Sequence, residues 1–375
     1  MIDIEGLKYR SRVRGCLLGG AIGDALGGPV EFWTHEQITE QCGPAGVTTF
    51  LPVEENGDTR YGLITDDTQM TLFTVEGLIR AGVRRDRGIG FTIGVTHHAY
   101  DRWLDTQLLA GPDGTRDGWL AGEQWLYARR APGTTCLSAL EAARRGGRRI
   151  TRFGIPAENT SKGCGGVMRS APFGLLPPHS DDLVDATFDA AAQSASYTHG
   201  HPTGQLASGA LAVLISAIVA GHELRDAVDA MVHSLQKRPG HEETTDALER
   251  ALSAATRPPS IQIVESLGGG WVAEEALAIA VYAALVHPGP GEILDALALA
   301  VTHSGDSDST GAICGNILGA LHGEAALPPE LAFEVEGRGV ILQLADDVIY
   351  EFTSHERLHG IGASSSRWRA RYPGW

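Results

Sequence analysis

The sequence is poor in cysteine, and its cysteines follow no pattern used for metal binding or for a disulfide framework. Five cysteines stand among 375 residues, at positions 16, 42, 136, 164 and 314, and no two form a C-x-x-C pair. A scattered, odd number of cysteines indicates neither a disulfide framework nor a zinc site. It fits a protein that stays in a reducing cytoplasm.

We expect neither a targeting segment nor a membrane-spanning segment. The chain begins Met-Ile-Asp-Ile-Glu-Gly, without the basic and then apolar order of a signal peptide. The longest apolar stretch, Leu206–Ala220, is interrupted by Ser208, Gly209 and Ser216 and is too short to cross a bilayer comfortably. We interpret it as a buried core helix and expect a soluble, cytoplasmic protein without membrane contact.

Positive charge is scarce. The formal net charge is -16, from 30 Lys and Arg against 46 Asp and Glu. The basic clusters Arg84–Arg87 and Arg144–Arg149 are short, and we interpret them as solvated loops rather than a phosphate-binding patch. Such a chain disfavours nucleic-acid binding. An anionic substrate would need local positive charge from a metal, a helix N-terminus or single cations.

Helical periodicity dominates what is present. Hydrophobic residues make up 43% of the chain and charged residues 20%, as in a globular protein with a sizeable core. Alternating runs are few, and Val47–Leu51 is the best strand candidate. The pattern predicts an all-α fold. Its clearest helical segments are Asp67–Ala81, Asp181–Ala195, Gln205–Ala220, Ala227–Gln236, Glu274–Val286 and Ile293–Val301.

Two series of glycines recur at a spacing of four residues. On a helix such positions share one face. Each glycine inside a helix costs roughly 0.5–1 kcal/mol relative to alanine, so a series in register needs a reason. We expect close helix–helix packing, with or without a ligand that approaches the backbone. The series are Gly15, Gly19, Gly23 and Gly27, and Gly311, Gly315 and Gly319.

Two acidic clusters interrupt apolar surroundings. In the first, Thr65 is a plausible helix N-cap followed by Asp66 and Asp67, and the helix dipole alone could account for these carboxylates. In the second, Asp306 and Asp308 precede the glycine-striped segment. Carboxylates with neighbouring hydroxyls and no adjacent Lys or Arg suit a hard cation.

The second cluster resembles the opening of an EF-hand loop, but Ile317 stands where that loop needs its twelfth, acidic residue, so an EF-hand is rejected. Neither cluster alone completes a six-coordinate site. Brought together, they could hold two ions, which implies one fold that joins both ends of the chain. A third acidic element contains Asp24 and Glu31, the latter either an exposed loop residue or an acid or base on a movable loop.

Five segments in this order resemble the ADP-ribosylglycohydrolase family, which includes dinitrogenase-reductase-activating glycohydrolases and ADP-ribosyl-arginine hydrolases. The resemblance is strongest over residues 12–323. It implies a single all-α domain over residues 1–375 with a two-metal cleft. The segments are Gly15–Gly27, Ile64–Leu72, Ser161–Arg169, Ser196–Pro202 and Ser304–Asn316.

The resemblance also implies the site residues. Two divalent cations, Mg²⁺ or Mn²⁺, would be held by six side chains. Thr310 is an alternative to Ser309 among them. The glycine-rich loop Ser161–Gly166 would receive the diphosphate and ribose. Lys162 or Arg169 could add positive charge there, although Lys162 could equally face solvent. The expected metal ligands are Thr65, Asp66, Asp67, Asp306, Asp308 and Ser309. The expected substrate-binding residues are Asp24, Asp101, Ser161, Lys162, Gly163, Cys164, Gly165 and His199.

The resemblance implies a metal-dependent hydrolase that releases ADP-ribose from a modified protein side chain. Arginine-linked ADP-ribose is our first choice of substrate, and serine-linked or small-molecule conjugates are the alternative. A catalytically silent ADP-ribose-binding or structural protein, or a toxin-neutralising partner, is a different class of function. We expect a monomer. The predicted catalytic residues are Glu31, Asp66, Asp67 and Asp308, with Asp101 or Asp105 as alternatives to Glu31 in proton transfer.

Overall fold

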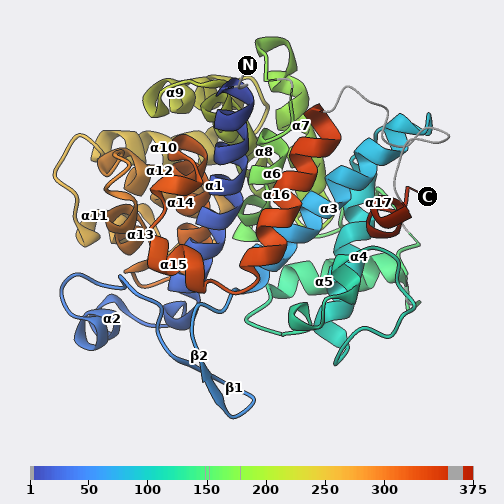
Figure 1. The fold of residues 1–375 in the computed structure, drawn as a ribbon. Coiled ribbons are helices and arrows are strands. Elements are labelled where there is room, and N and C mark those ends of the chain that lie inside the picture. The colour runs from blue at the N-terminus through green and yellow to red at the C-terminus, as the bar shows by residue number, and fades with distance from the viewer. Residues whose placement is uncertain (1–3, 148, 152, 178, 354–365, 375) are drawn as a thin grey trace.

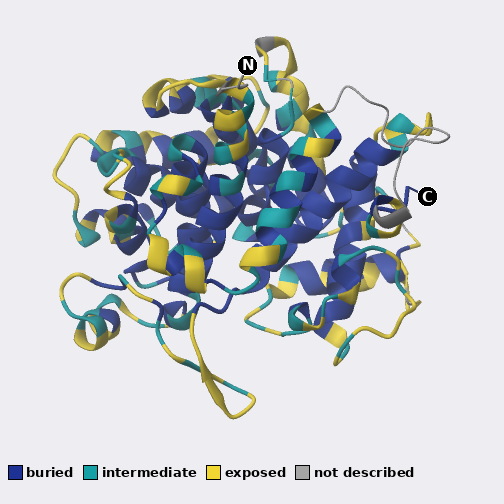
Figure 2. Cartoon of the chain, in the orientation of Figure 1, coloured by how far each residue is buried: buried dark blue, intermediate teal, exposed yellow. Residues whose placement is uncertain are grey.

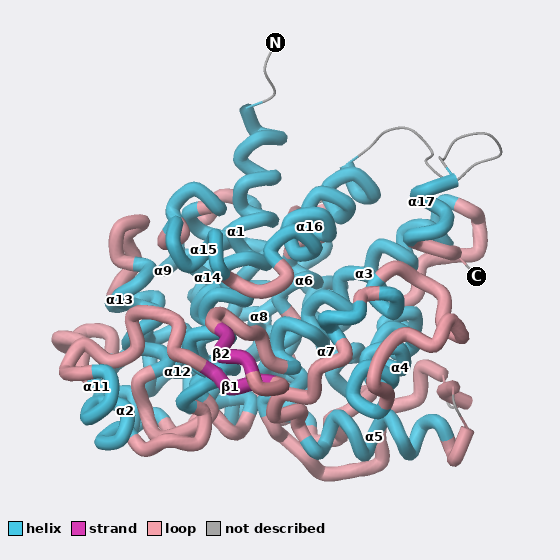
Figure 3. Tube along the Cα trace, turned by 60° about the horizontal axis from the view of Figure 1, so that its bottom comes forward, coloured by secondary structure: helices cyan, strands magenta, loops and turns pink. Residues whose placement is uncertain are grey.

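Helices build almost the whole molecule, as predicted. The computed structural model describes residues 4–147, 149–151, 153–177, 179–353 and 366–374. The strands of this described part form one antiparallel hairpin that projects from the helical body (Figure 1), β1 (Val53–Glu55) and β2 (Asp58–Arg60). Loops gather at the end of the helices near this hairpin (Figure 3).

The elements have the following bounds. The α-helices are α1 (Ile4–Gly27), α2 (His35–Cys42), α3 (Asp66–Asp86), α4 (Gly94–Leu108), α5 (Thr134–Arg144), α6 (Ala171–Gly174), α7 (Val184–Ser196), α8 (Pro202–Ala220), α9 (Leu224–Gln236), α10 (Glu242–Ala254), α11 (Ile261–Leu267), α12 (Ala273–Val286), α13 (Ile293–Val301), α14 (Ser307–His322), α15 (Pro329–Glu334), α16 (Arg338–Thr353) and α17 (Ser366–Arg371). The 3₁₀ segments are η1 (Gly28–Val30), η2 (Leu120–Gly122), η3 (Gln124–Leu126), η4 (Cys164–Arg169), η5 (Asp181–Leu183) and η6 (Glu324–Ala326).

The predicted helices are confirmed in place, whereas the predicted strand is wrong. Each of the six helical segments coincides with an α-helix, although the segment that begins at Asp181 opens with the 3₁₀ turn η5. Val47–Leu51 is not a strand. Val47 and Phe50 are buried in the core, and the Val47 N–H donates to the Thr302 hydroxyl rather than to a neighbouring strand. The apolar residues of this segment therefore reflect burial against the helices, not the alternation of a strand.

The two glycine series pack α1 against α14. A Cβ atom on Gly19 would lie 2.4 Å from the Gly315 carbonyl oxygen, and one on Gly23 would lie 1.9 Å from that of Gly311. No side chain fits at such distances, so the helices touch backbone to backbone. Figure 1 shows α1 and α14 side by side. The pairing is antiparallel and ends with Gly27 against Ser307. It therefore brings the end of α1 to the start of α14.

Buried residues concentrate on the central helices (Figure 2). Among the described residues, α8 is the one helix that is long and apolar enough to cross a membrane by composition. Its apolar window is 78% buried inside the protein, as in the core helix predicted from the sequence. It packs against α7, α9 and α12, so its apolar surface is covered by other helices.

Candidate active site

A cavity of about 380 Å³ lies where the starts of α3 and α14 meet the segment that follows α1. It is built from segments that are far apart in the sequence, as the pairing of the two acidic clusters requires. The residues that line it are Glu31, Phe32, Asp66, Asp67, Ala131, Pro132, Gly133, Thr134, Thr135, Cys136, Gly163, Cys164, Gly165, Met168, His199, Trp271, Asp306, Asp308 and Ser309.

The first turn of α3 is held by Asp24. Thr65 is the N-cap of α3, and its hydroxyl accepts from the Asp67 N–H. The same hydroxyl donates to Asp24 at 2.7 Å, and Asp24 also accepts from the backbone and hydroxyl of Thr68. Asp24 is fully buried and does not line the cavity. In this structure it orients Thr65 from behind instead of facing a substrate.

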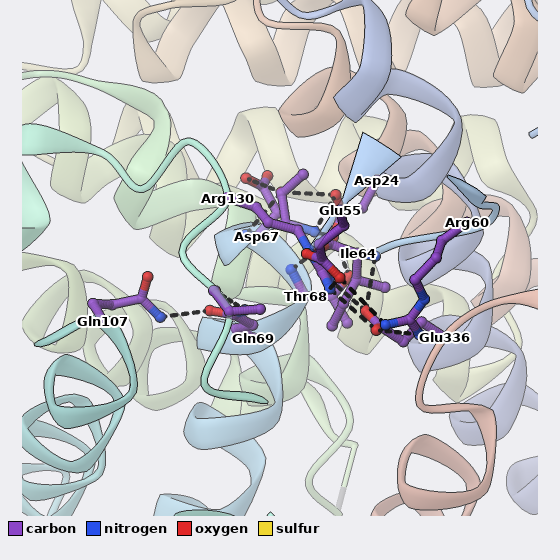
Figure 4. Close-up of polar contacts among 12 residues, drawn as sticks. Asp24, Glu55, Arg60, Ile64, Asp67, Thr68, Gln69, Gln107, Arg130 and Glu336 are labelled. Carbon is purple, nitrogen blue, oxygen red and sulfur yellow. Dashed lines mark hydrogen bonds and ion pairs between the residues drawn. The ribbon is translucent and has the colours of Figure 1, made fainter. Parts of the chain in front are cut away.

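An ion-pair network fixes the segment that leads into α3 (Figure 4). Arg130 lies between Glu55 of the hairpin and Glu336, and its guanidinium donates to the Ile64 carbonyl at 2.7 Å. Gln69 donates to the Ala128 carbonyl at 2.9 Å, which ties the cavity-lining loop to α3. These contacts place Asp66 and Asp67 at one wall of the cavity.

The start of α14 forms the opposite wall. Asp306 is the N-cap of this helix and accepts from the Ser309 N–H, while Asp308 lies in the first turn. The Ser309 hydroxyl donates to Asp67 at 2.8 Å, which links the two acidic clusters directly. The Cys164 thiol donates to Asp306 at 2.8 Å. Burial, followed by the charge of Asp306, raises the pKa of this thiol well above its usual range, which opposes a nucleophilic role.

The carboxylates of the cavity carry no balancing cation. Five carboxylates line it, and its lining contains no Lys or Arg. Burial, offset in part by the Gly133 N–H and reinforced by Asp24 and Asp306, raises the pKa of Asp66 to about 8. Burial and neighbouring carboxylates raise the pKa values of Asp67 and Asp308 well above their usual range. A site of this kind favours either protons or cations.

Glu31 projects into the cavity beside an exposed aromatic pair. Its side chain is buried, and its Oε2 atom has no hydrogen-bond partner among the described residues. Burial first, and then Asp306, Asp66 and Asp24, raise the pKa of Glu31 to about 8. The neighbouring Phe32 stacks on Trp271 with ring centroids 5.8 Å apart, although the two residues are 72% and 45% exposed.

The glycine-rich loop lines the cavity next to His199. Gly163 pairs with Val272 in an isolated antiparallel bridge, which fixes the loop to the segment that carries Trp271. A Cβ on Gly165 would lie 2.8 Å from the Cys136 sulfur and 3.1 Å from His199 Cε1, so only glycine fits there. Glycine at this position lets a ligand approach the backbone closely, although the N–H groups of Gly163 and Cys164 already donate to Ser161 and to the Trp271 carbonyl. Diphosphate binding by this loop stays a prediction.

The residues present fit hard divalent cations by chemistry. The expected ligands Asp66, Asp67, Asp306, Asp308 and Ser309 line the cavity, and the Thr65 hydroxyl is oriented by Asp24. Carboxylate and hydroxyl oxygens without balancing arginines are the donors that Mg²⁺ and Mn²⁺ use. Within the described residues, however, no group of three His, Cys, Asp or Glu side chains is arranged to hold a metal ion. The two-metal arrangement stays a prediction.

Besides Asp24 and Thr65, further predicted residues lie away from the cavity lining. Asp101 and its alternative Asp105 are buried on α4 and pair with Arg116 and Arg144. Lys162 pairs with Glu243 and Glu274 on another face. Ser161 is half-buried behind the loop, where its side chain contacts the Thr135 hydroxyl at 3.1 Å. Asp101, Asp105 and Lys162 are thus occupied by ion pairs in this structure.

The prediction of solvated loops was wrong for Arg144. Its side chain is 7% exposed and its guanidinium binds two buried carboxylates. Arg148, in the same basic cluster, lies outside the described residues. Sequence reasoning also missed Phe32, Trp271 and the stretch Ala131–Cys136, which line the cavity. The one available signal was the run Gly268–Gly270 before Trp271, which indicates a tight approach to another backbone.

The comparisons with known proteins show the family of this chain. The ADP-ribosylglycohydrolase family matches residues 5–357, nearly the whole chain, and the protein belongs to this family. Membership of this family makes it a glycosidic-bond hydrolase of the ADP-ribosylglycohydrolase type.

Three relatives and one solved structure illustrate the match. The chain is 29% identical to the uncharacterized protein YegU of Escherichia coli (strain K12), over 87% of this chain and 92% of that protein. It is 27% identical to the ADP-ribosyl-dinitrogen reductase glycohydrolase of Rhodospirillum rubrum, over 87% and 90%. It is 25% identical to the ADP-ribosylarginine hydrolase Tri1 of Pseudomonas putida (strain GB-1), over 90% and 77%. A solved ADP-ribosylglycohydrolase-related protein complex shares the fold, with a TM-score of 0.64 and 23% identity over 93% of this chain and 100% of that one.

Proposed function

We propose that the protein hydrolyses the N-glycosidic bond between ADP-ribose and an arginine side chain, with divalent cations bound in the cavity. The observation that carries this proposal is the cluster of five buried carboxylates without a Lys or Arg in the same lining. Such a cluster is costly unless cations neutralise it. Thr65, Asp66, Asp67, Asp306, Asp308 and Ser309 would hold the cations.

Bound divalent cations would supply a binding site for the ribose hydroxyls and would lower the pKa of a bound water molecule. The side chains that hold the cations are then unavailable for proton transfer. Glu31 remains, since it lines the cavity and none of the described residues forms a hydrogen bond with its Oε2 atom. It would move a proton between the attacking water and the leaving nitrogen.

The chemistry balances as a simple hydrolysis. The bond between C1 of the ribose and the guanidine nitrogen breaks through an oxocarbenium-like state. The oxygen of water bonds to C1, and its proton leaves with the nitrogen, so free ADP-ribose and unmodified arginine result. The glycine-rich loop at Gly163–Gly165, which lines the cavity, would let the diphosphate approach its backbone closely.

Two observations favour arginine over serine as the modified residue. The stacked rings of Phe32 and Trp271 are exposed and lie beside Glu31 in the cavity lining. Aromatic faces next to a carboxylate attract a guanidinium, whereas a serine side chain offers neither charge nor a planar group. In addition, one relative is named as an ADP-ribosylarginine hydrolase.

The test is release of ADP-ribose from arginine-modified and serine-modified proteins, with Mg²⁺, with Mn²⁺ and with a chelator. Metal-dependent release from the arginine substrate is the expected result. Release from the serine substrate alone would contradict the choice of bond, and release in the presence of chelator would contradict the role of cations. ADP-ribose binding without any release would indicate a catalytically silent protein on this fold.

A further inference from the structure

Arg169, at the end of η4, is buried next to the cavity, and no carboxylate of the described residues pairs with it. It is 1% exposed, and its guanidinium lies over the Tyr100 ring at 4.2 Å from the centroid. One terminal nitrogen, Nη1, contacts two weak sulfur acceptors, Met70 at 3.4 Å and Cys136 at 3.5 Å. Its Nε atom has no hydrogen-bond partner in the described part of the chain. Burying a guanidinium in this way is costly, so its position needs a reason.

The strongest contact of Arg169 leads to the cavity. Its Nη2 atom donates to the Thr198 hydroxyl at 2.6 Å, and this hydroxyl lies 2.9 Å from Nδ1 of His199. His199 lines the cavity. A Cβ atom built on Gly163 would lie 3.4 Å from its Nε2 atom, so Nε2 points at the glycine-rich loop. None of the described residues forms a hydrogen bond with Nε2.

The direction of these hydrogen bonds follows from donor chemistry. A guanidinium has donors only, so the Thr198 oxygen must accept from Arg169. The single hydroxyl proton then has three candidate acceptors, which are His199 Nδ1 at 2.9 Å, the Ala195 carbonyl at 3.3 Å and the Cys136 sulfur. A hydroxyl that accepts from a cation becomes a stronger donor, and the imidazole nitrogen is more basic than a carbonyl oxygen or a thiol sulfur and lies closer than the carbonyl. The proton therefore points at Nδ1.

We infer that Arg169 is a positioning residue: through Thr198 it fixes His199 as the neutral tautomer that carries its proton on Nε2. This tautomer presents an N–H donor to an oxygen of the ADP-ribose moiety, a phosphate oxygen or a ribose hydroxyl. The inference deepens the proposed function and rests on ADP-ribose occupying this cavity. It also revises the expectation that Arg169 adds charge by touching the diphosphate, because Arg169 is not part of the cavity lining.

The charge of the imidazole agrees with this arrangement. Burial first, and then the nearby Arg169 cation, lower the pKa of His199 to about 3, so the ring is neutral at physiological pH. A neutral imidazole has one donor and one acceptor, and the partner of one nitrogen decides which nitrogen donates. Without Thr198, either nitrogen could carry the proton.

The first experiment reads the tautomer directly in the intact protein. Long-range ¹H–¹⁵N spectra of histidine-labelled protein distinguish protonated from unprotonated ring nitrogens. The signals of His199 among the 14 histidines are assigned by their loss in His199→Gln. We expect a protonated Nε2 and an unprotonated Nδ1. A protonated Nδ1 in the unmodified protein would overturn the inference without any further variant.

The second experiment uses variants at Thr198. Thr198→Val removes the hydroxyl at nearly constant volume, and we expect mixed tautomers and about tenfold weaker ADP-ribose binding by calorimetry, the size of one lost hydrogen bond. Thr198→Ser keeps the hydroxyl and should restore both readouts. Thr244→Val is the matched control, because Thr244 is equally buried, lies on α10 and has no hydrogen-bond partner for its hydroxyl among the described residues.

The outcomes separate the two proposals. An unchanged tautomer and unchanged affinity in Thr198→Val would overturn the positioning role. If Thr198→Val fails to fold, the spectra of the unmodified protein and of Thr198→Ser still decide the tautomer. A fixed Nε2–H tautomer in a protein that bound no ADP-ribose would support the positioning of His199 and contradict the proposed function.

Discussion

Two regions of the molecule bury carboxylates, and they treat the negative charge in opposite ways. On α4, Asp101 and Asp105 are each paired with both Arg116 and Arg144. At the start of α3, Asp66 and Asp67 face a cavity whose lining contains no Lys or Arg. The first cluster is neutralised within the protein, which makes it structural. The second is left open, which suits cations that come from solution.

The largest expected effect concerns the open cluster. Asp66→Asn removes one expected cation ligand while keeping the size of the side chain. We expect ADP-ribose release in the presence of Mg²⁺ or Mn²⁺ to fall about 100-fold or more, since an electrostatic interaction with the developing transition state is lost. Asp229→Asn, the same change at an exposed ion pair, serves as the control. A variant that kept more than a tenth of the activity would contradict the assignment of Asp66.

A substitution in the paired cluster on α4 should lower the stability of the protein and leave its activity nearly unchanged. Arg144→Met leaves Asp101 and Asp105 with one arginine in place of two. We expect the free energy of unfolding to fall by about 3 kcal/mol, as when a buried pair loses one partner, while kcat per folded molecule changes by less than about threefold. Urea denaturation and the release assay measure the two quantities.

The matched control is Arg225→Met, at an exposed pair with a 3.7 Å separation, where we expect a cost below about 0.5 kcal/mol. Loss of activity with intact stability in Arg144→Met would show that the paired cluster belongs to the active site after all. The distinction between a structural cluster on α4 and a catalytic cluster in the cavity would then be wrong.

The open cluster also predicts how stability depends on pH when cations are removed. The pKa values of Glu31 and Asp66 are raised to about 8, so the folded protein holds protons that the unfolded chain releases near pH 4. Folding stability therefore falls as pH rises toward and through 8. Buried neutral histidines such as His97 and His199, whose pKa values are lowered to about 4 and about 3, act in the opposite direction only below about pH 6.5.

Above about pH 6.5 the cavity carboxylates determine how folding stability changes with pH. With chelator present, we expect the melting temperature to fall by about 5 °C between pH 6.5 and 8.5. Added Mg²⁺ or Mn²⁺ should remove most of this fall, because cations bind the ionised form, and Asp66→Asn should reduce it. A flat profile with chelator would indicate that the cavity carboxylates are neutralised by the protein itself, as on α4.

The smallest expected effect lies at the edge of the open cluster. Phe32→Ala removes one ring of the exposed pair while Trp271 remains. We expect KM for arginine-linked ADP-ribose to rise about threefold, the size of an exposed cation–π contact, while kcat and hydrolysis of a serine-linked substrate stay unchanged. Phe32→Tyr should behave as the original protein. An equal rise in KM for both substrates would show that the pair does not select arginine.

Much of the helical framework could be predicted, because the helix period and the glycine spacing are local patterns. The pairing of Gly19 with Gly315 follows once both segments are helical, since only two glycine faces allow backbones to touch. The same pairing brings Glu31, which follows α1, and Asp308, at the start of α14, to one cavity. Val47–Leu51 failed because its alternation comes from burial against Thr302, which no local pattern reveals.

The sequence by itself determined where helices begin, which faces carry glycine and which segments carry carboxylates. Only the tertiary structure decided which carboxylates are neutralised. Asp101 and Asp66 both lie on helices among apolar neighbours, yet one faces Arg144, 43 residues away, and the other faces the start of α14. The physical reason is that the charge state of a buried group depends on partners within a few ångströms in space, and chain folding alone brings those partners together.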